Sequence, residues 1–434
     1  MRPASFLFTS TGASEHVNFW ALGPRGRLLP PHPGPLPQGE GERWHNPWRR
    51  GSRTYRQGFR RKPNTEPDAS LSLGERAGVR GKNAPVSARV QIQSCALAAL
   101  IAASFAHAAE PKAGESPADH LPPHIRQVTW FGERADFSHD GKKILFLSKT
   151  FGDAMEIDLA TKDIRNVTAH FPHHGYTRAL YLANGDLLLS GPEAFDPKRI
   201  GEARVQCWLS VLDKSGTKPP TPLGTKCSEG PAVSRKRMHM AWTHVAAEYP
   251  DEMPAGSSRM FEADLVFEDG KPKLANQKLI IDSRDLPFRC TMETQNFRPP
   301  DEKELTFSAY GFQGTDVAGI DLVTKKVVNY SNSPGQYDEP EGIFPDGQFT
   351  LVECDKQNHK GSGYVDLWKL KLDGSGSYER LTHFSDYPGY KASNPVVSDD
   401  GRFIAFQMAK SREAAGVGHG IFVYDIEMAK QAKR

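Results

Sequence analysis

The stretch that decides the fold is residues 380–425, RLTHFSDYPGYKASNPVVSDDGRFIAFQMAKSREAAGVGHGIFVYD. It contains a short strand signal, a Gly-Tyr loop, a hairpin at Asp400-Gly401 and a third strand that ends at Asp425. Asp-Gly supplies the positive-φ residues that a tight hairpin turn requires. Weaker copies of this unit recur along the chain, and a strand-only unit that repeats at this length is typical of a radial or solenoid fold.

Six such units follow one another after residue 124, each with a turn followed by an apolar strand. The turns are Asp140-Gly141, Asn184-Gly185, Arg235-Lys236, Asp301-Glu302, Asp346-Gly347 and Asp400-Gly401. The strand after the first turn, Ile144–Leu147, is apolar at every position, as expected of a strand that is covered on both faces. The pattern predicts an all-β, six-bladed β-propeller over residues 125–430.

A repeated outer-strand signal indicates how the ring closes. Arg-Asn-Val-Thr (165–168) and Glu-Arg-Leu-Thr (379–382) each end a unit, and Arg-Gln-Val-Thr (126–129) occurs before the first unit begins. The last unit has no such strand of its own. We therefore predict that Ile125–Trp130 pairs with Ile421–Asp425 as the outer strand of the last blade, which removes an exposed sheet edge.

Charge and composition set the first 85 residues apart. They hold 14 Lys and Arg against 6 Asp and Glu, a net of +8, so the other residues carry 3 − 8 = −5. A mildly acidic folded part argues against nucleic acid as the partner. The Pro- and Gly-rich leader (1–85) is predicted to be disordered. It resembles a translated intergenic repeat upstream of a mis-assigned start, and a genuine disordered basic arm is the alternative.

Residues 86–108 have the pattern of a secretory signal peptide. Arg89 precedes the apolar run Cys95–Phe105, and Ala106-His107-Ala108 provides a small-x-small cleavage site. The run is too short to span a bilayer permanently, so no transmembrane segment is expected in the mature chain. We expect a linker at 109–124, a tail at 431–434 and a periplasmic or secreted protein.

Four cysteines remain after the expected cleavage site: Cys207, Cys227, Cys290 and Cys354. In an oxidising compartment they allow up to two disulfides, in any of three connectivities. Buried free thiols on strands are the alternative. Because no Cys-x-x-Cys pair occurs, a zinc knuckle or a thioredoxin-type site is not expected.

Three segments resemble TolB-type propeller repeats. They are FSHDGKKILF (137–146), LWKLKLDGSG (367–376) followed by Arg-Leu-Thr (380–382), and VSDDGRFIAF (397–406). The resemblance covers about residues 125–425 and is looser in the second to fourth units. It implies a periplasmic six-bladed propeller that binds proteins or small ligands. The α/β domain that TolB places before its propeller has no room here, which puts TolB's envelope role in doubt for this chain.

The loops that lead from one blade into the next should gather at one mouth of the channel. Polar, aromatic and charged groups that converge on a concave surface are typical of a ligand site. The predicted ligand-binding residues are His173, His174, Tyr176, Arg178, Tyr337, Glu339, Glu341, Tyr390 and Lys391. The alternative for the Gly-Tyr pairs is that the glycine makes a turn and the tyrosine packs under the next blade.

A divalent metal is a second possibility at this mouth. His173 and His174, with His170 nearby, could bind a metal together with Glu339 or Glu341. Adjacent histidines in an extended segment point to opposite faces, so both could ligate only with a turn between them. Exposed loop histidines are the plainer interpretation. Oligogalacturonate lyases are propellers of a related kind with a metal at the mouth, but no motif of theirs aligns here.

Two further kinds of catalytic residue pattern bear on this chain. Prolyl-oligopeptidase relatives carry similar propellers, but their hydrolase domain needs a Gly-x-Ser-x-Gly elbow, and none occurs in this sequence. Glu353 and Asp355 flank Cys354 at a strand end and share a face, which permits a carboxylate pair. Solvated charges at a strand edge are the alternative.

The sequence therefore predicts a monomeric, non-catalytic propeller without a cofactor. It would bind an envelope protein or a small polar ligand. The alternative function is a metal-assisted enzyme on an acidic polysaccharide, in which Arg178, Lys391 and Arg289 would hold the substrate carboxylates.

Overall fold

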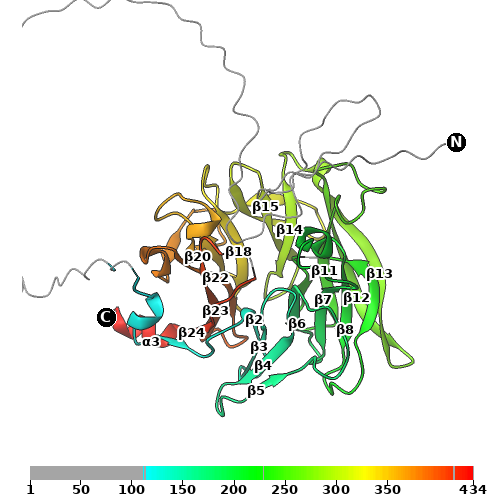
Figure 1. Cartoon of the computed structure of the whole chain (residues 1–434). Coiled ribbons are helices and arrows are strands. Elements are labelled where there is room, and N and C mark those ends of the chain that lie inside the picture. Colours follow the sequence, from blue (N-terminus) through cyan, green and yellow to red (C-terminus); the bar gives the residue numbers. More distant parts are fainter. Residues whose placement is uncertain (1–110, 112–113, 228, 414–415, 434) are drawn as a thin grey trace, which may run out of the picture. The chain divides into compact units, whose positions relative to one another are not determined.

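The computed structural model describes residue 111 and residues 114–227, 229–413 and 416–433. The predicted leader (1–85) and signal peptide (86–108) lie outside the described residues. The described part of the predicted linker carries a single 3-10 turn, η1 (Pro117–His120), capped by Ser116. From residue 125 onward the chain forms six sheets of four antiparallel strands each (Figure 1).

The first three blades each place their first strand innermost and their fourth strand outermost. Blade 1 consists of β2 (Glu133–Phe137), β3 (Lys143–Leu147), β4 (Ala154–Asp158) and β5 (Ile164–Asn166), blade 2 of β6 (Arg178–Tyr181), β7 (Leu187–Pro192), β8 (Cys207–Leu212) and β9 (Thr221–Lys226), and blade 3 of β10 (Ala232–Val233), β11 (His239–Val245), β12 (Ser258–Glu268) and β13 (Lys271–Asp282).

The last three blades follow the same order, and the sixth takes its outer strand from the beginning of the described chain. Blade 4 consists of β14 (Thr291–Phe297), β15 (Glu304–Tyr310), β16 (Thr315–Asp321) and β17 (Val327–Asn329), blade 5 of β18 (Asp338–Ile343), β19 (Phe349–Cys354), β20 (Asp366–Lys371) and β21 (Tyr378–Arg380), and blade 6 of β22 (Tyr390–Val397), β23 (Phe403–Lys410), β24 (Ile421–Asp425) and β1 (Ile125–Gln127).

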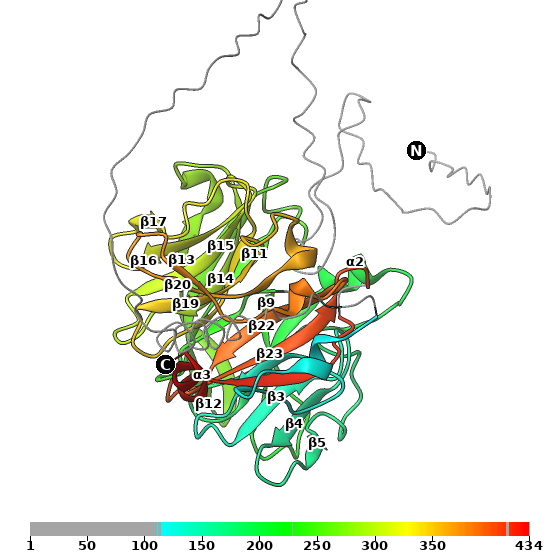
Figure 2. The same cartoon turned by 90° about the vertical axis from the view of Figure 1, so that its left-hand side faces the viewer.

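The predicted closure of the ring is confirmed. Strand β1 pairs antiparallel with β24, with Ile125 opposite Tyr424. Beyond the strand, the Val128 N–H donates to the Ile421 carbonyl at 2.8 Å, and the Ile421 N–H donates to Thr129 Oγ1 at 2.9 Å. The two ends of the propeller therefore share one sheet, and cyan and red strands lie side by side in Figure 2.

The core lies between neighbouring blades, as the continuous apolar run of the first unit predicted. Ile144, Leu145, Phe146 and Leu147 are all fully buried. Ile144 and Phe146 pack in one cluster with residues of blade 6, whereas Leu145 and Leu147 pack in another with residues of blade 2. Alternate side chains of a single strand thus join three blades.

Helices are few and short within the described residues. They are α2 (Ile200–Arg204), α3 (Ile426–Ala432) and the 3-10 turns η2 (Ser283–Asp285), η3 (Ser362–Tyr364) and η4 (Phe384–Asp386). Helix α3 directly follows the last strand, where Asp425 caps its N-terminus and Ala429 packs into the core. None of the helices described is long and apolar enough to cross a bilayer.

All four cysteines of the propeller are free thiols. Burial raises the pKa of Cys207 to about 12 and that of Cys290 to about 12. Thiols held in the protonated form are poor nucleophiles, so these residues serve as small packing groups in this structure.

Candidate functional site

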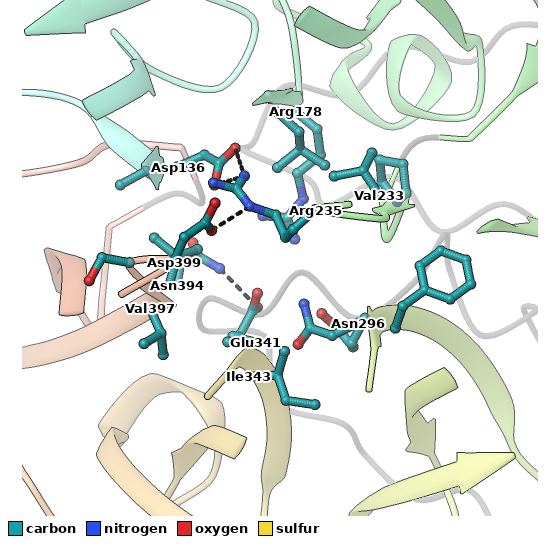
Figure 3. A pocket seen from close by; sticks show the side chains of 18 of the residues that line it. Asp136, Arg178, Val233, Arg235, Asn296, Glu341, Ile343, Asn394, Val397 and Asp399 are labelled. Carbon is teal, nitrogen blue, oxygen red and sulfur yellow. Dashed lines mark hydrogen bonds and ion pairs between the residues drawn. The ribbon is translucent and has the colours of Figure 1, made fainter. Parts of the chain in front are cut away.

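A cavity of about 260 Å³ lies at the centre of the ring. Every blade contributes residues of its inner strand to the wall. Blades 3 to 6 also contribute residues of the turn that follows, and Gly230 and Pro231 precede the inner strand of blade 3. Figure 3 shows side chains from different blades around this space, among them Arg178, Asn296, Glu341 and Asn394. The wall mixes charged and amide groups with apolar ones such as Val233, which is the composition expected of a site for a small polar molecule.

Four of the six inner strands carry a β-bulge at the level of this cavity. At each bulge the inner strand has residues without a cross-strand partner. They include Arg134 in β2, Gln295 in β14, Glu341 in β18 and Asn394 in β22. All four line the cavity. A bulge redirects a side chain that would otherwise alternate between the blade faces, and bulges are over-represented beside functional sites.

Two of the bulged residues have a left-handed backbone. Arg134 has φ of 55° and Asn394 has φ of 46°. This region is costly for a residue with a Cβ, and such strain persists only where the surrounding structure enforces it. The same side chains face the cavity, so the strain coincides with the candidate site.

Hydrogen bonds fix these side chains but leave two buried acceptors in the cavity wall unpaired. Asn394 Nδ2 donates to Glu341 Oε1 at 3.0 Å, while Asn394 Oδ1 has no hydrogen-bond partner among the described residues. Asn296 Oδ1 likewise has none within the described part of the chain. Asn394 is only 7% exposed, and a buried acceptor without a donor is unfavourable unless a ligand or water supplies one.

A group of four buried glutamates lies at and beside the wall formed by blades 4 and 5. Burial, with the added repulsion of Glu339, raises the pKa of Glu293 to about 8. Burial likewise raises the pKa of Glu341 to about 7, although Arg178 opposes this shift. Burial also raises the pKa of Glu339 and, with repulsion from its neighbours, that of Glu353 well above the usual range. We call these residues the glutamate cluster.

Hydrogen-bond stoichiometry requires a proton on Glu293 or Glu339. Tyr310 Oη lies 2.9 Å from Glu293 Oε2 and also contacts Glu339, which receives a second hydrogen bond from Tyr337. A phenol has one proton to donate, so Tyr310 can donate to one of the two carboxyls and must accept from the other. The hydrogen bonds from Tyr310 and Tyr337 lower the pKa of Glu339 against the effect of burial, whereas the pKa of Glu293 rises to about 8. We therefore assign the proton to Glu293.

A cross-channel bridge lies at the turn end of the cavity. Arg235, from the first turn of blade 3, donates through Nε to Asp399 of blade 6 and through Nη1 to Asp136 of blade 1. His139 Nδ1 also lies 2.7 Å from Asp399 Oδ2. Burial opposes ionisation of Asp399, yet the hydrogen bond from His139 and the charge of Arg235 lower its pKa. The bridge therefore ties three blades together over the cavity (Figure 3).

The structure brings together only some of the residues predicted from the sequence. Arg178 and Glu341 line the cavity, and Glu339 belongs to the glutamate cluster beside them. Lys391 is buried and donates to the Ser362 carbonyl at 3.2 Å, and its charge lowers the pKa of Glu353 against the effect of burial.

The other predicted residues lie in or beneath the loops before the inner strands. His173 Nε2 lies 3.2 Å from Asp153 Oδ1, and its ring packs on Tyr176, which is buried. His174 is exposed, and Tyr390 is half-buried. None of these residues belongs to the wall of the cavity, which consists of other residues of the inner strands and of the turns that follow the inner strands of blades 3 to 6.

Metal ligation finds no support in the arrangement of side chains. No group of three or more His, Cys, Asp or Glu residues within the described ranges could hold a metal ion. The interpretation of Glu353 and Asp355 as solvated edge charges is wrong, because both are buried, at 0% and 2% exposure. Glu353 belongs to the glutamate cluster, whereas Asp355 accepts from the backbone N–H groups of Tyr337 and Gly361.

Sequence reasoning did not single out most of the cavity wall. Arg134, Gln295 and Asn394 each lie six positions before the first residue of a hairpin turn, and Glu341 lies five before Asp346. A polar residue recurring at this distance from the turn was the available signal. This signal is not specific, because polar residues are expected in any inner strand that faces a water-filled channel.

Six four-stranded blades closed by an N-terminal strand define a six-bladed β-propeller, and its candidate site is the central channel. No protein-family model matches the chain, and no curated protein matches it. The fold assignment therefore depends on the strand pairing itself.

Solved structures of other propellers resemble this one. TolB from Acinetobacter baumannii is 16% identical with a TM-score of 0.38, and the match covers 68% of this chain but 66% of that TolB, just under two thirds of its length. A gluconolactonase from Xanthomonas campestris is 10% identical with a TM-score of 0.45, covering 69% and 88% of the two chains. An oligogalacturonate lyase from Vibrio parahaemolyticus is 11% identical with a TM-score of 0.40, covering 70% and 93%. Because a fold does not determine a function, function must be argued from the site.

Proposed function

We propose that this protein is an exported, non-catalytic propeller that binds a small polar molecule in its central channel. The observation that carries the proposal is the ring of bulged residues Arg134, Gln295, Glu341 and Asn394, which four separate blades aim into one cavity. Packing alone does not require four blades to break their strand register at the same level.

The size of the cavity favours a small ligand over a protein segment. Its volume of about 260 Å³ lies just below the range usual for drug-sized ligands. The amide groups of Gln295, Asn296 and Asn394 belong to the wall and give it polar groups for a ligand N–H or O–H. Arg178, which makes its two ion pairs through Nη2 alone, would donate through its remaining nitrogens.

Export is the second part of the proposal. It rests on the signal-peptide pattern of residues 86–108 and places the propeller, residues 125–430, in the periplasm or outside the cell. The leader at 1–85 is then either removed or absent from the natural product. Edman sequencing of the secreted protein would test this, since we expect its N-terminus at residue 109.

Ligand binding can be tested with a panel of sugars, amino acids, amines and carboxylates. The purified protein would be heated with each compound, and isothermal titration calorimetry would follow for any compound that raises the Tm. The variant Asn394→Gly removes the cavity side chain and is compatible with the positive φ. Its matched control is Asn332→Gly, because Asn332 also has positive φ (43°) but is exposed in a loop outside the cavity.

We expect at least one compound class to bind the wild type and the Asn332→Gly control with equal affinity. Asn394→Gly should weaken that binding by about tenfold, which corresponds to one lost hydrogen bond to a buried acceptor. If no compound binds, or if both variants bind as the wild type does, the channel is not the site. Capture of an envelope protein instead would favour the other predicted partner.

The alternative function, a metal-assisted enzyme on an acidic polysaccharide, has no specific observation in its favour. Arg289, one of its expected carboxylate-binding residues, is exposed and does not line the cavity. The binding module is therefore the function that we put forward.

A further inference from the structure

The ionisable groups around the cavity are divided between two opposite walls. On one wall, three guanidinium groups surround the carboxylate of Glu229. Arg134 Nη1 lies 2.8 Å and Arg178 Nη2 lies 3.4 Å from Glu229 Oε2, and Arg204 pairs with the other oxygen. Arg134 also approaches Glu133 at 3.6 Å. This wall, formed by blades 1 and 2 and the start of blade 3, holds the guanidinium groups, of which those of Arg134 and Arg178 line the cavity.

The opposite wall holds the carboxyl groups. Glu293 comes from blade 4, and Glu339, Glu341 and Glu353 come from blade 5. Burial raises the pKa of all four, so their ionisation depends on nearby cations. Arg178 lies 3.7 Å from Glu293 and favours the ionised form of Glu341, and Lys391 favours that of Glu353.

Each wall presents a charged group to the cavity with bonding capacity left over. Glu341 uses Oε1 to accept from Asn394, and its Oε2 has no hydrogen-bond partner among the described residues. Asn394 Oδ1, beside it, is also without a donor there. On the other side, Arg178 Nε and Nη1 have no partner within the described part of the chain. Acceptors thus lie on one wall and donors on the other.

We infer that the channel binds a zwitterion, with its carboxylate on Arg178 and Arg134 and its protonated amine on Glu341 and Asn394. This assignment of ligand class rests on the proposed function. A guanidinium recognises a carboxylate through paired hydrogen bonds, and an ammonium group donates to the free oxygens of the opposite wall. A simple anion or cation would satisfy one wall and face like charge on the other, which disfavours it.

A series of ω-amino acids tests the inference and measures the separation of the walls. Glycine, β-alanine, γ-aminobutyrate and ε-aminocaproate would be titrated into the full chain at about pH 7, where both end groups are charged. Butylamine, butyrate and the uncharged glycerol serve as probes that lack one or both charges. We expect one member of the series to bind at least about tenfold tighter than butylamine or butyrate.

Two variants assign the ends of the ligand. Glu341→Gln should weaken the binding of the zwitterion and of butylamine by about tenfold and leave the binding of butyrate unchanged. Arg178→Gln should weaken the binding of butyrate by about tenfold and leave that of butylamine unchanged. Glu341→Gln is isosteric and removes a buried carboxylate that resists ionisation, so it keeps the test valid if the arginine variant fails to fold.

The outcomes separate this inference from the proposed function. If glycerol or another uncharged probe binds as tightly as the zwitterions, the channel is a ligand site but the zwitterion assignment is wrong. If butylamine binds as tightly as any amino acid, the positive wall takes no part and the assignment is again wrong. If no probe of any class binds, the proposed function itself fails.

Discussion

Arg235 Nε donates a hydrogen bond of 2.7 Å to Asp399 Oδ1, and this contact joins the first turn of blade 3 to that of blade 6. The same guanidinium reaches Asp136, which is 7% exposed, and the Phe137 carbonyl at 2.8 Å. Burial raises the pKa of Asp136, and Arg235 counteracts that shift. One side chain therefore holds together turns that are distant in sequence.

Removing this bridge should destabilise the propeller. Arg235→Gln leaves the buried Asp136 without its cation, and we expect a loss of about 1–3 kcal/mol in the free energy of unfolding, measured in urea. Adding Asp136→Asn to this variant should recover part of the loss, because the uncompensated charge is gone. Equal stability of Arg235→Gln and the wild type would show that the bridge is only a surface contact.

Stability should depend on pH through Glu293. Its folded-state pKa of about 8 lies above its ordinary value of 4.5, so the folded protein binds more protons than the unfolded chain between these values. The stabilisation is complete below about pH 4.5 and is lost as the pH rises through about 8. In Glu293→Gln the amide N–H remains a hydrogen-bond donor to Tyr310, but the side chain cannot ionise. This variant should therefore be more stable than the wild type at about pH 8.5.

Urea unfolding at several pH values would check this expectation. The control is Glu302→Gln, because Glu302 is also buried and lines the cavity but bonds Ser234 and Arg237 outside the glutamate cluster. A pH profile of Glu293→Gln that follows the wild-type profile would contradict the assignment of the proton.

The left-handed backbone at Asn394 should make the stability of a variant depend on whether the new residue has a Cβ. Asn394→Ala keeps a Cβ at a φ of 46° and loses the hydrogen bond to Glu341, whereas Asn394→Gly loses the same bond but relieves the backbone. We expect the glycine variant to be about 1 kcal/mol more stable than the alanine variant. Thermal unfolding of both variants would measure the difference, and an alanine variant of equal or greater stability would refute the strain.

The ring of blades was predictable because its signals are local. Asp140-Gly141 and Asp400-Gly401 form the predicted turns, with Gly141 and Gly401 at φ of 67° and 70°. The outer-strand signal at residues 126–129 indicated the closing strand, because the last unit has no outer strand of its own. Turn chemistry and strand alternation act over a few residues, and a single sequence displays them directly.

The candidate site was less predictable because its causes are not local. A bulge at Glu341 depends on how β18 pairs with β19, and nothing in the composition of the segment reports the extra residue. The burial of Glu353 depends on the blades that surround the channel, and the local sequence of a buried charged residue near a strand end does not differ from that of a solvated one. Arg235 reaches blades 1 and 6 only because the ring brings their turns together.

Removing the closing strand should abolish the cooperative fold. A chain that begins at residue 114 keeps every described strand and should unfold at the temperature of the full chain. A chain that begins at residue 131 lacks β1 and exposes the edge of β24, so we expect aggregation and loss of a single thermal transition. Equal melting of the two truncations would show that β1 contributes nothing to closure.

The pairing of β1 with β24 also orders events during synthesis. Thr129 and Ile421, which bond across the joint, are separated by 292 positions. The first strand to leave the ribosome is therefore the last to find its neighbour, and a translation product that stops before residue 421 has no partner for it. Every incomplete chain is left with an open ring, which gives the cell's proteases a physical basis for telling half-made copies from finished ones.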